Sequence, residues 1–215
     1  MAATAPSPRP LRHARRKEAR PSEILAAALA LFAEHGFAAT RLEDVARRAG
    51  VSKGTIYLYF PTKEALFRAV IRQGLVPNIA AMEALAAAHA GSAAALLTEI
   101  AARLLAITES DLAVIPRLVL TESGNFPNLA RFYAEEVAGQ GRSLIASIIA
   151  RGIGRGEFRP IDVQSAVSLF AAPILLILLW RTTFARHGIV PFDPKALLET
   201  HLEMFFRGLA PDASP

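Results

Sequence analysis

The sequence predicts an all-α protein whose helices run from about residue 21 to about residue 207. Apolar residues recur at spacings of three and four along most of this stretch, which is the period of an amphipathic helix. Residues that favour helix starts precede many of these runs, and no segment alternates apolar and polar residues as a strand does. With 215 residues, of which 53% are hydrophobic, the chain can bury a core in one large domain or in a small domain joined to a larger one.

Positive charge is concentrated at the N-terminal end of the chain. The formal net charge is +5, and residues 1–21 carry six basic side chains against a single acidic one. Such asymmetry indicates a polyanionic partner at this end, although a solvated basic tail would have the same composition. Residues 1–20 are rich in Pro, Ala and Arg without an apolar period, so we expect a disordered basic arm there.

Several classes of protein are disfavoured by what the sequence lacks. Without cysteine, a disulfide, a Cys-ligated zinc ion and a thiol nucleophile are excluded. No nucleophile elbow, phosphate loop or paired-acid signature is present, so we expect no enzyme, no metal and no cofactor. The first ten residues lack the apolar core of a signal peptide, and we therefore expect a cytoplasmic protein. No metal-ligand spacing relates the five histidines, His13, His35, His89, His187 and His201.

The first helix is expected to begin at Pro21. Its apolar residues fall on one face, and Gly36 follows as a candidate C-cap because glycine tolerates a left-handed backbone. The members of this face are Ile24, Ala28, Leu31 and Phe32.

Two short helices follow. Thr40 and Glu43 form the pattern of a capping box, which predicts the start of the second helix, and Gly50 predicts its end. Ser52 is the expected cap of a third helix that runs to about Phe60.

A fourth helix is expected from Lys63 to about Val76, where Pro77 breaks or kinks it. The remainder predicts helices throughout, and Pro194 after Asp193 is typical of a helix start. The expected spans are 78–89, 92–109, 112–123, 127–152, 162–186 and 194–207.

The segment from Ala166 to Trp180 is almost wholly apolar. A membrane span needs about 20 such residues, whereas this run is shorter, contains Pro173 and continues into Arg181. A helix that is apolar on all sides can instead lie between a core and a partner subunit. We favour the buried helix, which indicates an oligomer and no membrane.

The segment from Thr40 to Lys63 has the organisation of a helix-turn-helix, in which the second helix enters the major groove of DNA. Ile56 and Phe60 lie four residues apart and should anchor that helix, together with Leu42, Val45 and Val51. The outward faces would then carry Lys53, Gly54, Thr55, Tyr57, Leu58 and Tyr59.

These residue types suit contact with nucleic acid. Hydroxyl and ammonium groups can reach phosphates, while a Thr methyl group or Leu58 can touch a thymine methyl group. Gly54 allows close approach, and Lys63 stands where a cation and backbone amides can hold a phosphate.

Four groups of residues occur in a fixed order, namely Phe37-Ala-Ala-Thr40, Val45-Ala46, Ala49-Gly50-Val51-Ser52-Lys53-Gly54-Thr55 and Tyr57-x-Tyr59-Phe60-x-x-Lys63-Glu64-x-Leu66. In register, this order resembles the DNA-binding domain of TetR/AcrR-family regulators. The resemblance implies a three-helix head over residues 21–66 and a helical body over residues 67–215 that binds a ligand and forms a homodimer. Where Tyr59 stands, the family often has histidine. The implied DNA contacts are Thr40, Arg41, Lys53, Gly54, Thr55, Tyr57, Leu58, Tyr59 and Lys63.

The resemblance further implies a repressor that leaves a palindromic double-stranded DNA operator when a small apolar or aromatic effector binds the body. Candidate pocket residues, each of which could equally be ordinary core, are Met82, Leu104, Arg117, Leu118, Glu122, Phe126, Phe132, Phe170 and Trp180. Candidates for the dimer interface on the last two helices are Phe170, Leu175, Leu179, Leu198, Leu202, Phe205 and Phe206. A membrane-surface or scaffolding protein that uses the basic arm and the apolar helix is the alternative.

Overall fold

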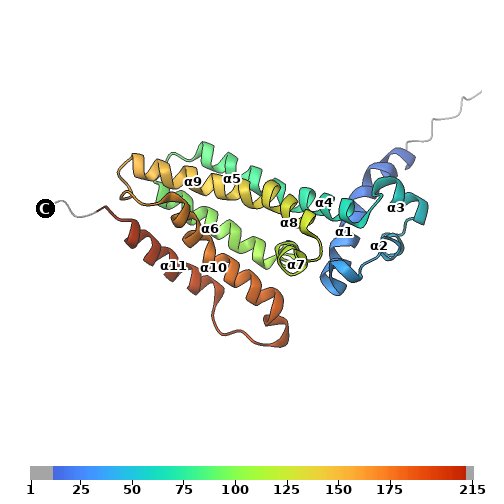
Figure 1. The fold of residues 1–215 in the computed structure, drawn as a ribbon. Helices are drawn as coiled ribbons and strands as arrows, with labels where there is room; N and C mark the ends of the chain where they lie inside the picture. Colours follow the sequence, from blue (N-terminus) through green and yellow to red (C-terminus); the bar gives the residue numbers. More distant parts are fainter. Residues whose placement is uncertain (1–11, 212–215) are drawn as a thin grey trace, which may run out of the picture.

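The fold comes from a computed structural model that describes residues 12–211. It is helical throughout this range and contains no strand there, as the sequence predicts. Three helices form a small head at one end of an elongated molecule, and the C-terminal helices lie toward the opposite end (Figure 1). The head consists of α1 (Arg12–Ala39), α2 (Leu42–Arg48) and α3 (Lys53–Tyr59).

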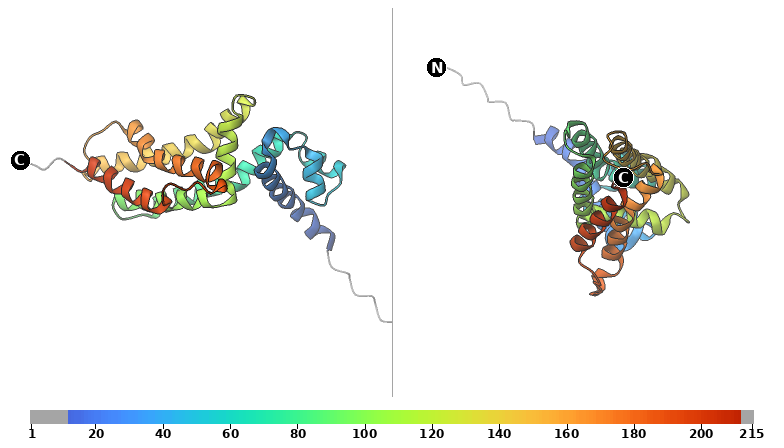
Figure 2. Two further views of the ribbon diagram at one scale, coloured as in Figure 1. Left: turned by 90° about the horizontal axis from the view of Figure 1, so that it is seen from below. Right: turned by 90° about the vertical axis from the view of Figure 1, so that its left-hand side faces the viewer.

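Helix α4 (Lys63–Gly74) leads from the head into the body, and a view from below shows the head standing out from the body at this connection (Figure 2). Leu75 separates α4 from α5, so the predicted break occurs just before Pro77 and not at it. The body comprises α5 (Val76–Ala88), α6 (Ala93–Glu109), α7 (Val114–Glu122), α8 (Pro127–Tyr133), α9 (Gly139–Gly154), α10 (Val163–Thr183) and α11 (Pro194–Leu209).

Helix α1 differs from its expected start. It begins at Arg12 and contains Pro21, so the boundary expected at residue 20 falls inside a helix. The Arg, Lys, Glu and Ala residues of this stretch have high helix propensity. The prediction relied on an apolar period, which this stretch lacks, and therefore placed the start of the helix too late. Residues 1–11 of the expected arm lie outside the described residues. Gly36 interrupts the helix with φ 81° and ψ 169°, a conformation that only glycine adopts readily.

Side-chain caps start several of the helices, among them two where the sequence predicts them. The Ser52 hydroxyl accepts from the Thr55 amide at 3.1 Å, and Asp193 caps α11 ahead of Pro194. The prediction of a capping box at Thr40 is wrong. Arg41, and not Thr40, is the N-cap of α2, and its side chain makes no cap hydrogen bond. The Thr40 hydroxyl donates instead to the carbonyl of Gly36 at 2.7 Å.

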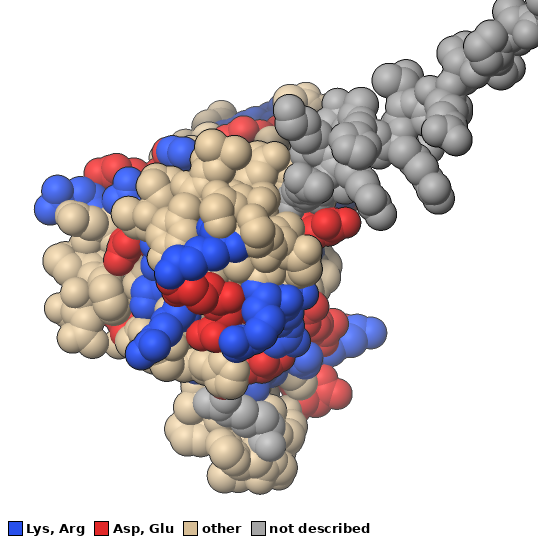
Figure 3. Space-filling view, turned by 90° about the vertical axis from the view of Figure 1, so that its right-hand side faces the viewer, with Lys and Arg blue, Asp and Glu red and all other residues tan. Residues whose placement is uncertain are grey.

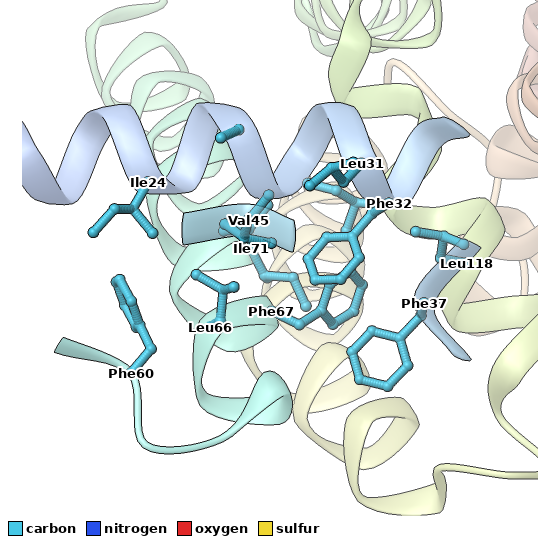
Figure 4. Packing of buried hydrophobic residues seen from close by; sticks show 14 of the residues in the cluster. Ile24, Leu31, Phe32, Phe37, Val45, Phe60, Leu66, Phe67, Ile71 and Leu118 are labelled. Atoms are coloured by element: carbon cyan, nitrogen blue, oxygen red, sulfur yellow. The ribbon is translucent and has the colours of Figure 1, made fainter. Parts of the chain in front are cut away.

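Two apolar clusters form the core. In the first, the rings of Phe32, Phe37 and Phe67 lie 5.1–5.5 Å apart, and α2, α3, α7 and α8 pack around them (Figure 4). Leu118 of α7 and Phe132 of α8 are buried in this cluster, so the head packs directly on the body. The second cluster lies between α5, α6, α9, α10 and α11.

The predicted single helix over 127–152 is divided. A π-helical turn, Ala134–Ala138, joins α8 to α9. At its end, an added Cβ on Gly139 would lie 2.9 Å from the Ala134 carbonyl oxygen, so glycine allows the close approach of this wider turn.

Helix α10 contains the apolar segment. By length and composition it is one of two helices in the described range that could cross a membrane, the other being Pro21–Ala39 of α1. One face of α10 is buried in the second cluster, through Phe170 and Ile177 among others. A core helix accounts for this burial, and its other face carries exposed leucines.

Candidate DNA-binding face and ligand site

Helix α3 is anchored from behind as the sequence predicts. Ile56 is fully buried, Phe60 is 9% exposed, and both belong to the first apolar cluster. Leu42 and Val45 of α2 are buried beside them, and Val51 packs against the same cluster. The orientation of α3 is therefore set by packing, which leaves its opposite face free for recognition.

The outward face of α3 carries the expected side chains. Leu58 is 81% exposed, Tyr57 is 40% exposed, and Gly54 is open to solvent. Thr55 is half-buried, and its hydroxyl lies 2.8 Å from that of Ser52. Tyr59 is half-buried with its ring 6.4 Å from that of Phe60, so it belongs partly to the anchor of the helix.

Glu43 of α2 connects two of these outward side chains. Its carboxylate lies 3.0 Å from the Lys53 ammonium and accepts a 3.0 Å hydrogen bond from the Tyr57 hydroxyl. Lys53 first, then the backbone and Tyr57, lower the pKa of Glu43 from 4.5 to about 2, while Glu43 raises the pKa of both Lys53 and Tyr57. The sequence reasoning missed this role of Glu43, because its place in the capping-box pattern explained the residue locally.

Other basic side chains of the head are also paired. Arg47 binds Asp44, and Arg48 binds Glu34, each at 2.5 Å. The end of the molecule that carries the head shows basic and acidic side chains interleaved on one surface (Figure 3). The described part of this face therefore carries paired basic and acidic side chains and is not a uniformly positive patch.

Thr40 and Lys63 are both engaged within the protein, at the end of α1, and their contact with DNA stays a prediction. The Thr40 side chain is buried, 3% exposed, and its hydroxyl is used at the end of α1. The Lys63 ammonium donates to the carbonyls of Phe37 and Ala38 at 2.7 and 2.8 Å. Burial lowers the pKa of Lys63, partly offset by Glu64 and Glu122. Both side chains therefore stabilise the end of α1.

The nine candidate pocket residues do not converge on one cavity. Leu118, Phe126 and Phe132 belong to the first apolar cluster, whereas Met82, Leu104 and Phe170 belong to the second. Trp180 packs on Phe184 and Phe192 at the end of α10, donating to the Ile189 carbonyl at 2.9 Å. Glu122 is half-buried near the end of α1 and contributes to the electrostatics at Lys63. An apolar residue type alone does not distinguish a pocket wall from core.

A cavity of about 670 Å³ lies where the head meets the body, between α1 and the segment of α6, α7 and α10 that faces it. Arg117 is the pocket candidate that lines it. A face of α1 that is mainly alanine forms one wall, and charged groups, including an Arg181–Glu109 pair at 3.4 Å, form another. The α1 wall consists of Ala26, Leu29, Ala30, Ala33 and Glu34. A smaller cavity of about 290 Å³ between α5 and α6 is lined by Met82.

The dimer candidates divide by exposure. Phe170, Leu198, Leu202 and Phe205 are buried within the protomer, and their place at an interface stays a prediction. They are the residues that hold α10 and α11 onto the second cluster. Leu179 and Phe206 are half-buried, and Leu175 is 44% exposed. The sequence reasoning missed three further exposed apolar residues of these helices, namely Leu169, Leu176 and Met204, at 57%, 44% and 69%.

Comparison with known proteins agrees with this arrangement. Residues 24–70 match the family model described as bacterial regulatory proteins, tetR family, and residues 87–189 match a tetracyclin repressor-like C-terminal domain. The HTH-type transcriptional regulator RutR of Escherichia coli O157:H7 is 33% identical over 186 residues, which cover 80% of this chain and 76% of RutR.

Solved structures have the same fold. A putative TetR-family transcriptional regulator from Mesorhizobium loti, 25% identical, superposes with a TM-score of 0.71 over 92% of this chain and 98% of its own. FadR from Bacillus subtilis, in complex with stearoyl-CoA, superposes with a TM-score of 0.74 at 24% identity, over 87% of this chain and 98% of FadR. The chain belongs to the TetR family of bacterial transcriptional regulators, which bind DNA through an N-terminal helix-turn-helix.

Proposed function

We propose that this protein is a dimeric repressor that binds a palindromic operator and leaves it when a small molecule binds at the junction of head and body. The observation that carries the proposal is the face of α3, where Lys53, Tyr57 and Leu58 point outward while Ile56 and Phe60 hold the helix from behind. A helix anchored in this way presents a rigid surface to the major groove.

Each outward residue has a contact that its chemistry favours. Lys53 and Tyr57 suit phosphate oxygens, because an ammonium and a hydroxyl donate to them without reading sequence. Leu58 suits a thymine methyl group, and exposed Gly54 lets the backbone approach the groove. Arg41 is exposed ahead of α2 and supplies a further cation, while Thr55 and the partly exposed Tyr59 lie at the margins of the surface.

The dimer is proposed to form through the exposed face of α10 and α11. Leu169, Leu176 and Met204 are large apolar side chains that the protomer leaves exposed, together with Leu175. Exposed apolar residues that gather on two adjacent helices are typical of a subunit interface. An isologous dimer through this face would present two copies of α3 to the two half-sites of a palindrome.

The effector is proposed to bind in the cavity between α1 and the body. Its volume is within the range of small-molecule sites, and its walls combine apolar and charged groups. A ligand there would touch both the head and the body, so it can favour a conformer whose heads no longer match the operator. The complex of FadR with stearoyl-CoA shows that this fold accommodates a ligand with a long apolar chain.

Binding to its own promoter tests the DNA-binding part. Fluorescence anisotropy with the promoter fragment and with a scrambled duplex, over a salt series, should give sequence-dependent affinity that weakens steeply as salt rises. Leu58→Asp places a charge on the DNA face without touching the core and should abolish this preference. Equal affinity for the two duplexes would reduce the protein to a non-specific basic binder and refute the proposal.

The effector part has a separate test. Ala30→Trp places a large side chain in the cavity wall and should make operator binding insensitive to any compound that releases the unmodified protein. Ala84→Trp, at an exposed position of α5 outside the cavity lining and away from the proposed dimer face, is a control for the added ring. Unchanged release from Ala30→Trp would place the effector elsewhere and leave the DNA-binding proposal intact.

A further inference from the structure

Glu43 is an acidic residue on the surface that is proposed to meet DNA. From α2 its carboxylate reaches the Lys53 ammonium and the Tyr57 hydroxyl of α3, each at 3.0 Å. Lys53 lies 5.8 Å from the centre of the Tyr57 ring, so the three side chains form one compact group. A single carboxylate therefore binds the polar atoms of two residues proposed to contact phosphates.

The contacts of Glu43 are those that a DNA phosphate would make. A phosphate oxygen and a carboxylate oxygen are both anionic acceptors for an ammonium and a hydroxyl. The low pKa of Glu43, about 2, keeps the group ionised at neutral pH. The Tyr57 hydroxyl has a single proton to donate, so a phosphate and the Glu43 carboxylate compete for it. The Lys53 ammonium has three protons, but a phosphate that binds it beside Glu43 meets a like charge, so the two anions compete there as well.

We propose that Glu43 competes with the DNA backbone for Lys53 and Tyr57. Its carboxylate holds both side chains in the free protein and must be displaced when a phosphate binds them. The inference rests on the proposed function, since it takes the outward face of α3 as the DNA-binding surface. Glu43 then lowers the affinity for every duplex, because its charge remains beside the phosphates after displacement. The consequence is a repressor that leaves DNA more easily than its cations alone would allow.

The chain contains a matched control for removal of this charge. Glu99 on α6 pairs with Arg103 at 3.1 Å, and its side chain is 44% exposed, compared with 42% for Glu43. It belongs to the body and not to the head. Glu43→Gln and Glu99→Gln therefore change the net charge equally, but only the first changes the DNA-facing surface.

Fluorescence anisotropy of the full chain with its promoter fragment and with a scrambled duplex tests the proposal. Glu43→Gln should bind both duplexes more tightly, on the order of tenfold at 0.1 M salt, with a salt dependence steeper by about one in log–log slope. Glu99→Gln should match the unmodified protein. In the double variant Glu43→Gln/Lys53→Ala, the gain should be lost, because the freed ammonium is absent.

Other outcomes overturn the inference. If Glu43 only positions α3, Glu43→Gln will bind the promoter more weakly. Unchanged affinity would show that no phosphate reaches the group. If the unmodified protein does not distinguish the two duplexes, the proposed function fails, while the comparison on the scrambled duplex still decides the role of Glu43.

Discussion

The ammonium of Lys63 lies 2.7 Å from the carbonyl oxygen of Phe37, which joins the start of α4 to the end of α1. The same nitrogen donates to Ala38 and lies 4.7 Å from the centre of the Phe37 ring. Gly36 turns the chain just before these carbonyls. The last carbonyls of a helix lack partners within it, so Lys63 acts as a remote cap for them.

Lys63→Met should therefore destabilise the head. The expected loss is about 1–3 kcal/mol, because two carbonyls lose a charged donor. Thermal unfolding measures the loss, with Lys195→Met at a 79% exposed side chain as the control. We expect the salt dependence of DNA binding to keep its slope. A slope lowered by about one at unchanged stability would instead identify Lys63 as a phosphate contact.

Leu58 should contribute to sequence preference and not to folding. Leu58→Ser removes an apolar contact with the major groove and should relax the preference at one base pair, at a cost of about 1–3 kcal/mol on the operator. Because the side chain is 81% exposed, stability should change by less than about 0.5 kcal/mol. Affinities for single-base operator variants and a thermal melt measure the two effects. Equal losses on all sequences would contradict base contact by Leu58.

The proposed dimer face can be tested by adding charge to it. Met204→Glu should give monomers in light scattering, because a charge would be buried at the interface. Loss of the second half-site contact should lower operator affinity by at least about a hundredfold. Leu120→Glu on α7, at 49% exposure, is the matched control and should remain dimeric. Dimers that persist with Met204→Glu would exclude this face.

Gly152 should be the most sensitive glycine of α9. A Cβ added there would overlap the Phe158 ring and lie 3.0 Å from the Ala93 Cβ. Gly152→Ala should therefore destabilise the body by about 1–3 kcal/mol through overpacking. Gly154→Ala on the same helix meets nothing within 4 Å and should be neutral or stabilising. Urea unfolding of the two variants measures the difference, and similar midpoints would contradict it.

The lowered pKa of Glu43 predicts a pH dependence of stability. Because the folded pKa of about 2 lies below the ordinary 4.5, the contribution of Glu43 is fully present above pH 4.5 and is lost as the pH falls through about 2. The stability difference between the unmodified protein and Glu43→Gln should be constant from pH 5 to 8 and should shrink below pH 4.5. Urea titrations across this range measure it. A difference that disappears near pH 6 would contradict the assignment.

Much of the recognition surface could be predicted from local sequence. Ile56 and Phe60 share one face of a short helix, so the positions of Tyr57 and Leu58 on the other faces follow from helical period alone. Ser52 and Asp193 cap their helices as predicted, since a cap depends on residues only two or three positions away.

The errors concern groups whose partners the local pattern does not identify. Thr40 matched a capping box, but the end of α1 provided a competing acceptor in the Gly36 carbonyl. Leu198 and Leu202 are as apolar as Met204, and only packing against the second cluster distinguishes the buried pair from the exposed residue.

The sequence by itself determined the helical class of the fold, the helix-turn-helix and the residues that anchor α3, because each depends on spacing within a few turns. Only the tertiary structure decided that Lys63 caps α1, that Glu43 holds Lys53 and Tyr57, and which apolar residues remain exposed. Hydrogen-bond partners and solvent exposure depend on segments brought together by folding, and helical period carries no information about them.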